Sequence, residues 1–328
     1  MGFKIKIYKM KKYLFSLLIA FNSFIYAQDT MEFTDLYGDY LGQTPPGDTP
    51  VVFAPGIIST DSLIEHSAPT FSPDGKEVFW WIVRSPKTSD EKWTSWGMTM
   101  RCIEGRWTVP EVTPYYGGPT FSIDGKQLYF PGLYPDKKTD GPYFIDKQGN
   151  HWSQPKKLGI VARFPEIKGA GSFSITRNGT FYFNGDTEGN EQTADNRIFR
   201  TKLVNGEYTK LELLPHSINL TPNHNLFPFI APDESYLIFI SNREGSFGGG
   251  DLYISFHDIN TDTWTEPINM GVPINTDKEE RFPGLSPDGK YLFFTRLTRS
   301  GFPDFDHDVF WVSTDIINRL KDKYNIKN

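Results

Sequence analysis

The stretch HSAPTFSPDGKEVFW, residues 66–80, joins a turn signal directly to a strand signal, and this combination decides the fold. Pro in SPDG presets a turn, Asp accepts hydrogen bonds from nearby backbone N–H groups, and Gly takes a positive φ without steric cost. The following run EVFWWIV is rich in aromatic and β-branched residues, as strands are. The stretch therefore predicts a hairpin turn that leads into a strand.

The same pattern recurs along the chain, which indicates structural repeats. SPDG-like tetrapeptides begin at five positions: Ser72, Ser122, Thr176, Ala231 and Ser286. Their spacings are 50, 54, 55 and 55 residues, and four of the five have Pro three residues earlier. The third repeat departs from this pattern, with Phe173 in that place. One active site has no need of five copies of a turn, so we interpret the repeated Asp as structural.

The repeats continue as three or four strand-like runs each, and the last repeat lacks its fourth run. A matching run, TPVVFAPGIIS, stands alone from residue 49, before the first repeat. If this N-terminal strand completes the last repeat, no open sheet edge remains. We therefore predict an all-β fold: a single β-propeller over residues 50–314, most simply with five four-stranded blades, although six stays an alternative. Residues 315–328 predict a short C-terminal helix with Thr314 as its N-cap.

The first 27 residues have the composition of a secretory signal peptide. They contain five Lys and no acidic residue, and they continue into the apolar run YLFSLLIAFNSFIYA. This run is short for a membrane span. We expect cleavage near Ala27, a lead segment over residues 28–49, no membrane insertion, and a periplasmic or secreted protein.

The chain is acidic once the signal peptide is removed. The whole sequence has 34 basic and 40 acidic residues, so loss of the five N-terminal Lys leaves a net charge of −11. A strongly acidic chain is a poor partner for nucleic acid or an anionic membrane. Cys102 is the only cysteine, so no internal disulfide forms. We expect a monomer with no cofactor and no metal.

One acidic motif needs separate treatment. In PDFDHD, residues 303–308, Asp304, Asp306 and Asp308 alternate as in a calcium loop. The Gly and the distal Glu of that loop are missing, so we predict an acidic surface turn here.

The motif P-x-F-S-P-D-G-K, followed by an apolar strand and a later D-[LIV]-Y, resembles the PD40 or TolB-like propeller repeat. The resemblance covers residues 50–314 and implies the propeller fold. The opening YLGQTPPGDTPVVFAPGIIS, residues 40–59, resembles that of marine Bacteroidetes propellers associated with algal polysaccharide use, among them the ulvan oligosaccharide dehydratases. This second resemblance implies β-elimination on a uronic acid, by a dehydratase or a lyase.

The candidate site residues come from the segments that enter the innermost strands, because these line the mouth of a propeller channel. Six residues before each tetrapeptide the repeats differ, with His66, Tyr116, Ala170, Asn225 and Glu280. A position that varies between repeats is free of a common packing role.

Elimination from a uronate needs a proton acceptor, a proton donor and a cation for the carboxylate. We predict that the catalytic residues are His66, His224 and Tyr116. We predict that the residues binding an anionic oligosaccharide are Arg281, Lys168, Arg243, Arg84, Asn225 and Glu280.

Two other functions stay open at this point. The channel mouth could be a passive surface of a non-catalytic periplasmic propeller that binds a protein or a glycan. A glycoside hydrolase would instead need a pair of carboxylates, for which Glu65, Glu279 and Glu280 are the candidates.

Overall fold

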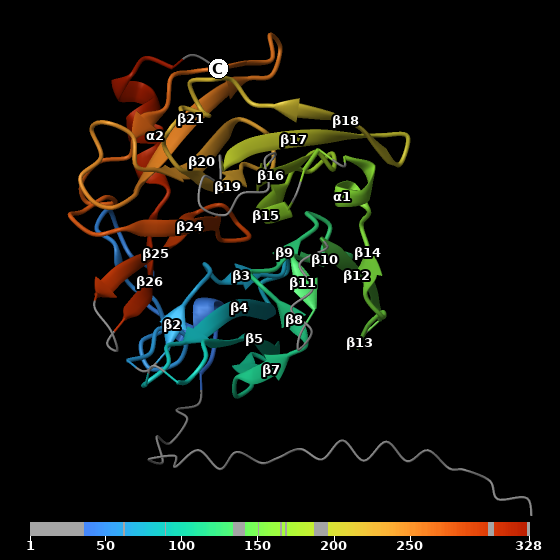
Figure 1. Cartoon of the computed structure of the whole chain (residues 1–328). Coiled ribbons are helices and arrows are strands. Elements are labelled where there is room, and N and C mark those ends of the chain that lie inside the picture. Colours follow the sequence, from blue (N-terminus) through green and yellow to red (C-terminus); the bar gives the residue numbers. More distant parts are fainter. Residues whose placement is uncertain are drawn as a thin grey trace, which may run out of the picture. The chain divides into compact units, whose positions relative to one another are not determined.

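The computed structural model describes residues 36–326, apart from residues 62, 89, 134–141, 150, 165, 168, 187–195 and 301–304. The predicted signal peptide lies outside this part. The described residues form five antiparallel blades, as predicted, and successive blades follow one another along the chain in Figure 1. No helix of the described part is long and apolar enough to cross a membrane.

Each blade runs from an inner strand at the central channel to an outer strand at the surface. The inner strands are β3 (Thr70–Phe71), β9 (Thr120–Phe121), β15 (Gly169–Ile175), β19 (Asn225–Ile230) and β24 (Glu280–Leu285). Two short strands precede the first two of these: β2 (Ile64–Glu65) and β8 (Tyr115–Tyr116). The second strands are β4 (Glu77–Arg84), β10 (Gln127–Phe130) with β11 (Gly132–Leu133), β16 (Phe181–Asp186), β20 (Tyr236–Ser241) and β25 (Tyr291–Arg299).

The two outer layers complete the blades. The third strands are β5 (Thr94–Ile103), β12 (Tyr143–Gln148), β17 (Arg197–Val204), β21 (Asp251–Asp258) and β26 (Asp306–Ser313). The outer strands are β6 (Arg106–Trp107), β7 (Glu111–Thr113), β13 (His151–Trp152), β14 (Lys156–Lys157), β18 (Glu207–Leu213), β22 (Thr263–Trp264), β23 (Ile268–Asn269) and β1 (Val51–Val52). Three short helical segments are η1 (Asp39–Gly42), α1 (Ile160–Arg163) and α2 (Asp315–Lys323).

The repeated tetrapeptide forms the turn between the first and second strands, as predicted. In the last blade Ser286 Oγ donates to Asp288 Oδ1 at 2.7 Å, and the same oxygen accepts the backbone N–H of Lys290. Gly289 has φ +72°, which glycine adopts at little cost. In the fourth blade Glu234 takes this position with φ +65°, and its carboxylate accepts the Tyr182 hydroxyl of the neighbouring blade at 2.6 Å.

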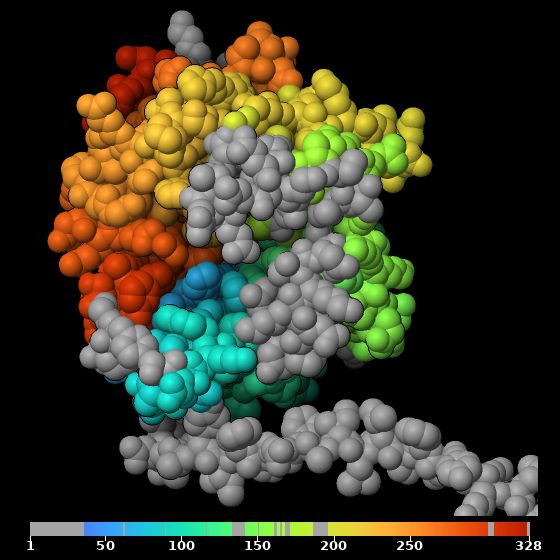
Figure 2. Space-filling model, viewed as in Figure 1, coloured from blue at the N-terminus to red at the C-terminus, as the bar shows by residue number. Residues whose placement is uncertain are grey.

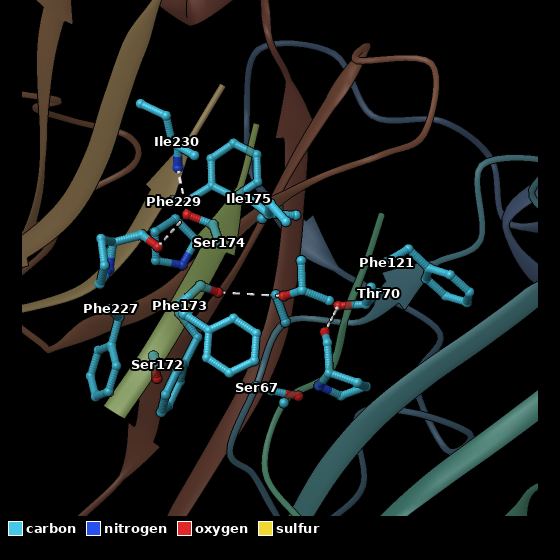
Figure 3. A pocket seen from close by; sticks show the side chains of 18 of the residues that line it. Ser67, Thr70, Phe121, Ser172, Phe173, Ser174, Ile175, Phe227, Phe229 and Ile230 are labelled. Atoms are coloured by element: carbon cyan, nitrogen blue, oxygen red, sulfur yellow. Dashed lines mark hydrogen bonds between the residues drawn. The ribbon is translucent and has the colours of Figure 1, made fainter. Parts of the chain in front are cut away.

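Hydroxyl groups on the inner strands join the first four blades around the channel. Thr70 Oγ1 donates to the carbonyl of Pro119 at 2.8 Å, and Ser174 Oγ donates to the carbonyl of Pro228 at 2.9 Å (Figure 3). Thr120 makes the corresponding bond between the second and third blades. Each bond satisfies a carbonyl on the next inner strand, so the repeated hydroxyl fixes the spacing of the blades.

The N-terminal strand closes the ring, as predicted. β1 pairs with β26, with Val51 opposite Trp311, so the last blade takes its outer strand from the start of the chain. Figure 2 accordingly shows the blue and cyan atoms of the first blade beside the red atoms of the last. Ring closure in this way covers the edge of β26 and ties the two ends of the propeller chain into one blade.

The lead segment strengthens this closure through Tyr40. Its ring contacts Phe71 of the first blade and both Tyr291 and Trp311 of the last, at centroid distances of 5.6, 5.3 and 5.7 Å. Its hydroxyl donates to Asp288 at 2.8 Å. The ring therefore packs across the boundary between the first blade and the last.

We expect Tyr40→Ala to lower the free energy of unfolding by about 2 kcal/mol, because it removes aromatic contacts and leaves a cavity at the closure. Thermal unfolding should then occur roughly 5 °C lower. The matched control is Tyr37→Ala, since Tyr37 is 56% exposed and should leave the melting temperature unchanged. Equal melting temperatures for the two variants would contradict a closing role for Tyr40.

The C-terminal helix is present as α2 and ends at Lys323, within the predicted segment. Ile316, Ile317 and Leu320 pack it against the core of the last two blades. Thr314 is the N-cap residue, but its hydroxyl donates to the carbonyl of Gly289 instead of capping the helix.

The predicted acidic surface turn is wrong for the described part of residues 303–308. Asp306 begins β26, is only 4% exposed and forms an ion pair with Arg299. The alternating pattern arises because this segment is already a strand, where successive side chains point to opposite faces. No group of three or more His, Cys, Asp or Glu in the described residues is arranged to hold a metal ion.

Candidate functional site

The central channel contains a cavity of about 650 Å³, lined by residues of all five inner strands. Figure 3 shows part of this lining, with labelled residues from the first four blades. It extends from His66, which precedes β3, to the tetrapeptide turns that follow the inner strands. Binding cavities for small molecules typically measure about 300–1,000 Å³. The cavity is therefore large enough for a ligand of several connected rings.

The lining of this cavity contains no Asp or Glu among the described residues. Its polar groups are mostly hydroxyls, such as those of Ser67, Ser172 and Ser174, and its charged or titratable members are His66 and Arg177. In a chain with more acidic than basic residues, an acid-free cavity is a local reversal of charge. It favours neutral or anionic ligands over cationic ones.

The blades differ in the size of the side chain that they place on the cavity wall. Four residues before each tetrapeptide, the first three blades place a small residue on the wall and the last two place Phe, and all five line the cavity: Ala68, Gly118, Ser172, Phe227 and Phe282. The two Phe rings contact each other with centroids 4.0 Å apart. At this position the first three blades therefore occupy less of the cavity than the last two, although Phe173 of the third blade also lines it.

The backbone at the two Phe residues is strained. Phe227 has φ +53° and Phe282 has φ +50°, a left-handed conformation that costs a bulky residue on the order of 1–3 kcal/mol. Both lie where the register of the inner strand shifts by a bulge. Strain that persists on a cavity wall is typical of functional sites.

His66 lies on the cavity wall beside this Phe pair. Its ring contacts Trp81 and Phe282, each at a centroid distance of 4.9 Å. Its Nδ1 is buried and has no hydrogen-bond partner among the described residues. Burial, and next the nearby charge of Arg281, lowers the pKa of His66 to about 4. The imidazole is thus neutral at pH 7 and has a nitrogen available to accept a proton.

The predicted substrate-binding residue Arg281 lies in β24 next to the cavity residue Phe282 but does not itself line the cavity. It directly precedes Phe282, its Nη2 pairs with Glu279 Oε1 at 2.6 Å, and its Nε is buried without a partner in the described part. Its guanidinium therefore keeps donor capacity for a further anion. Its charge lowers the pKa of His66, so the two groups lie near each other, although Arg281 itself does not line the cavity.

His307 lies near His66 and Arg281 and was not predicted as a site residue. These three residues are called the His66 cluster. His307 lies in β26, is 2% exposed, and neither ring nitrogen has a partner among the described residues. Burial lowers the pKa of His307 to about 3, with smaller contributions from Arg281 and His66. The sequence does carry a signal for it: among the second residues of the five third strands, His307 is the only histidine.

The buried carboxyl group of Glu65 lies next to His66 in the chain. Glu65 is fully buried, and its Oε1 accepts from the backbone and the hydroxyl of Thr60 at 3.3 Å each. Burial, with repulsion from Asp306 and Asp308, raises the pKa of Glu65 to about 10. This carboxyl group is therefore protonated at neutral pH, and it does not line the cavity.

Several predicted site residues are not brought to the cavity. His224 is exposed, and Arg84 is exposed with its guanidinium 5.8 Å from the Trp96 ring; neither lines the cavity. Tyr116 lies in β8, but its side chain is outside the described residues, as is Lys168. The prediction for Tyr116 and Lys168 is therefore not decided.

Arg243, Asn225 and Glu280 have structural partners instead of open donors or acceptors. Arg243 donates to the carbonyls of Ser217 and Ile218 and to Asn225 Oδ1 at 2.8–3.0 Å. Glu280 is fully buried and pairs with Arg296 at 2.8 Å. These bonds attach loops to the blades, so we remove these three residues from the predicted substrate site.

No family model matches the chain, so the PD40 resemblance stays a prediction from its motifs. A search of curated proteins returned no match either.

Among solved structures, the chain is similar to a protein of unknown function from Dyadobacter fermentans, with 14% identity, a TM-score of 0.45, and coverage of 82% of this chain and 83% of that one. It is also similar to an oligogalacturonate lyase from Vibrio parahaemolyticus, with 13% identity, a TM-score of 0.41, and coverage of 77% and 66%. A third is an α-L-arabinofuranosidase from Podospora anserina, with 8% identity, a TM-score of 0.42, and coverage of 81% and 96%. At these identities we base the functional proposal on this chain's own cavity.

Proposed function

We propose that the protein catalyses β-elimination on the uronic acid of an anionic oligosaccharide, forming a 4,5-unsaturated uronate. The observation that carries the proposal is a neutral imidazole, His66, on the wall of an acid-free cavity, with the charge of Arg281 near enough to lower its pKa. The residue types match the needs of the reaction, which are a base for the C5 proton and a cation for the adjacent carboxylate.

The reaction would proceed as follows. Arg281 binds the carboxylate and stabilises the negative charge that develops on it when the C5–H bond breaks. His66 accepts the C5 proton on a ring nitrogen, the C5 electron pair forms the C4–C5 double bond, and the C4–O bond breaks. The leaving oxygen departs with a proton from a donor at the same end of the channel. Tyr116, whose backbone lies in β8, is the predicted donor.

The cavity supports elimination better than glycoside hydrolysis. Hydrolysis of that kind uses two carboxyl groups about 5–9.5 Å apart at the glycosidic bond. The three candidates were Glu65, Glu279 and Glu280, and none of them lines the cavity. Glu65 and Glu280 are fully buried, and Glu279 is paired with Arg281.

The nature of the leaving group separates a lyase from a dehydratase. Purified protein should be incubated with uronate oligosaccharides, including those of ulvan type that the resemblance of residues 40–59 suggests, and the products weighed by mass spectrometry. A lyase splits the chain into two fragments, whereas a dehydratase leaves it whole and lighter by one water. Binding without any unsaturated product would support the alternative of a non-catalytic propeller.

We propose that the reaction takes place in the periplasm or outside the cell, as the predicted signal peptide implies.

The pH profile provides an independent prediction. Because kcat/KM reports the free enzyme and the pKa of His66 there is about 4, the neutral base persists well below pH 6.5. We expect kcat/KM to stay level from pH 7 to about pH 5 and to fall with a midpoint near pH 4. Circular dichroism at each pH would verify that the protein stays folded. A midpoint near 6.5 would indicate an ordinary, solvated His as the base.

A further inference from the structure

The end of the cavity opposite His66 is rimmed by the repeated turns. The second residue of each tetrapeptide lines it, and these residues are Pro73, Ile123, Arg177, Pro232 and Pro287. Four of the five are apolar, so Arg177 is the only charged side chain among these lining residues, and the Asp that follows in each of the other four turns does not line the cavity. The repeat itself calls for Pro at this position, because Pro presets the turn. The Arg is therefore specific to the third blade and has no role in the common turn.

Arg177 has no counter-ion within the described part of the protein. Its backbone N–H donates to the carbonyl of Pro232 at 2.8 Å, which fixes the turn against the next blade. Its side chain is exposed, and no described acidic group pairs with the guanidinium. A guanidinium at the edge of an acid-free cavity, attached to a turn whose backbone is fixed, can bind an anion.

The side of the cavity formed by the first three blades connects this cation to the catalytic end. The Phe227–Phe282 pair fills the wall of the last two blades, whereas the first three blades carry small residues at the same position. The free space thus leads from His66 on the first blade to Arg177 on the third. The seven residue steps from His66 to Pro73 limit the separation of these two residues to about 23 Å. The cavity volume of about 650 Å³ is in the range of small-molecule binding sites and leaves room for more than one sugar ring.

We propose that Arg177 binds a second anionic group of the ligand whose first carboxylate is held near His66 and Arg281. The substrate class is then an oligosaccharide with anionic groups on at least two separate sugar units, either carboxylates or sulfate esters. This inference rests on the proposed function for the position of the first carboxylate, and it adds a specificity-determining residue outside the reacting centre.

The test measures binding by titration calorimetry with Arg177→Gln, in both the active protein and a His66→Gln background that prevents turnover. Three probes are used: an oligosaccharide with one terminal uronate and otherwise neutral units, an oligouronate, and a sulfated oligosaccharide with one uronate. Arg177→Gln should weaken binding of at least one multiply charged probe about tenfold and leave the singly charged probe unchanged. The oligouronate and the sulfated probe show which anion Arg177 takes.

The control variant is Arg319→Gln, which removes an exposed Arg of α2 that pairs with Asp48 and does not line the cavity. It should leave all three affinities unchanged. An equal loss for every probe, no loss with Arg177→Gln, or no binding of any probe overturns the inference. If Arg177 discriminates the probes but no unsaturated product forms, the proposed reaction fails and the second anion site stands. If unsaturated product forms but Arg177→Gln binds every probe as the wild type does, the proposed reaction stands and the second anion site fails.

Discussion

His66→Gln is expected to lower kcat for β-elimination by roughly 10²–10⁴-fold, the usual contribution of a positioned general base. Gln keeps the polarity and much of the size of the side chain but cannot accept the C5 proton. Because His66 contacts Trp81 and Phe282 without a hydrogen bond to its Nδ1, the substitution should have little effect on the fold. Turnover can be followed by the ultraviolet absorbance of the unsaturated uronate, alongside the melting temperature.

His216→Gln is the matched control, since His216 is exposed and does not line the cavity. It should retain full turnover. His224→Gln is informative as well, because the sequence predicted a catalytic role that its exposed position does not support. A loss with His224→Gln as large as with His66→Gln, or full turnover in His66→Gln, would contradict the assignment of the base.

Glu65→Gln is expected to stabilise the protein, increasingly so as the pH rises. The pKa of Glu65 is raised to about 10 in the folded protein, whereas the unfolded chain ionises near 4.5. Between these values the unfolded state binds fewer protons, so stability is fully present below pH 4.5 and is lost as the pH rises towards 10. At pH 7 the wild type has lost at most about 3 kcal/mol of its stability for this reason. The Gln variant avoids this loss because Gln does not ionise.

The groups around Glu65 determine how the experiment is read. Asp306 and Asp308 face it and have raised pKa values of their own, while Arg299 pairs with Asp306. Chemical unfolding of wild type and Glu65→Gln should therefore be compared from pH 5 to pH 8, with the exposed Glu244→Gln as control. The stability difference should grow with pH for Glu65→Gln only. A constant difference, or a destabilised variant at pH 8, would show that Glu65 is ionised in the folded protein.

The architecture was predictable because the turn chemistry repeats. SPDG fixes a local backbone geometry, and its five copies carry enough local signal to count blades and to infer closure by the N-terminal strand. The contacts of Tyr40 were not predictable, because they join residues roughly 250 positions apart in sequence through packing alone.

The site was only partly predictable, for two physical reasons. Variation between repeats correctly drew attention to His66, but the same variation at Asn225 and Glu280 serves loop attachment in the last two blades. Partner choice of this kind depends on side-chain direction, which repeat position does not give. His307 lies in a third strand, and Arg177 replaces a structural Pro in the turn. Neither residue lies in the segments that enter the inner strands, from which the candidate residues were predicted.

The central claim is that His66 removes the C5 proton of a uronate bound in the channel. The most direct measurement is the mass of the product formed from a uronate oligosaccharide deuterated at C5. The account predicts an unsaturated product that has lost the deuterium, formed by the wild type and not by His66→Gln. A product that retains the deuterium, or one formed equally by both proteins, would contradict it.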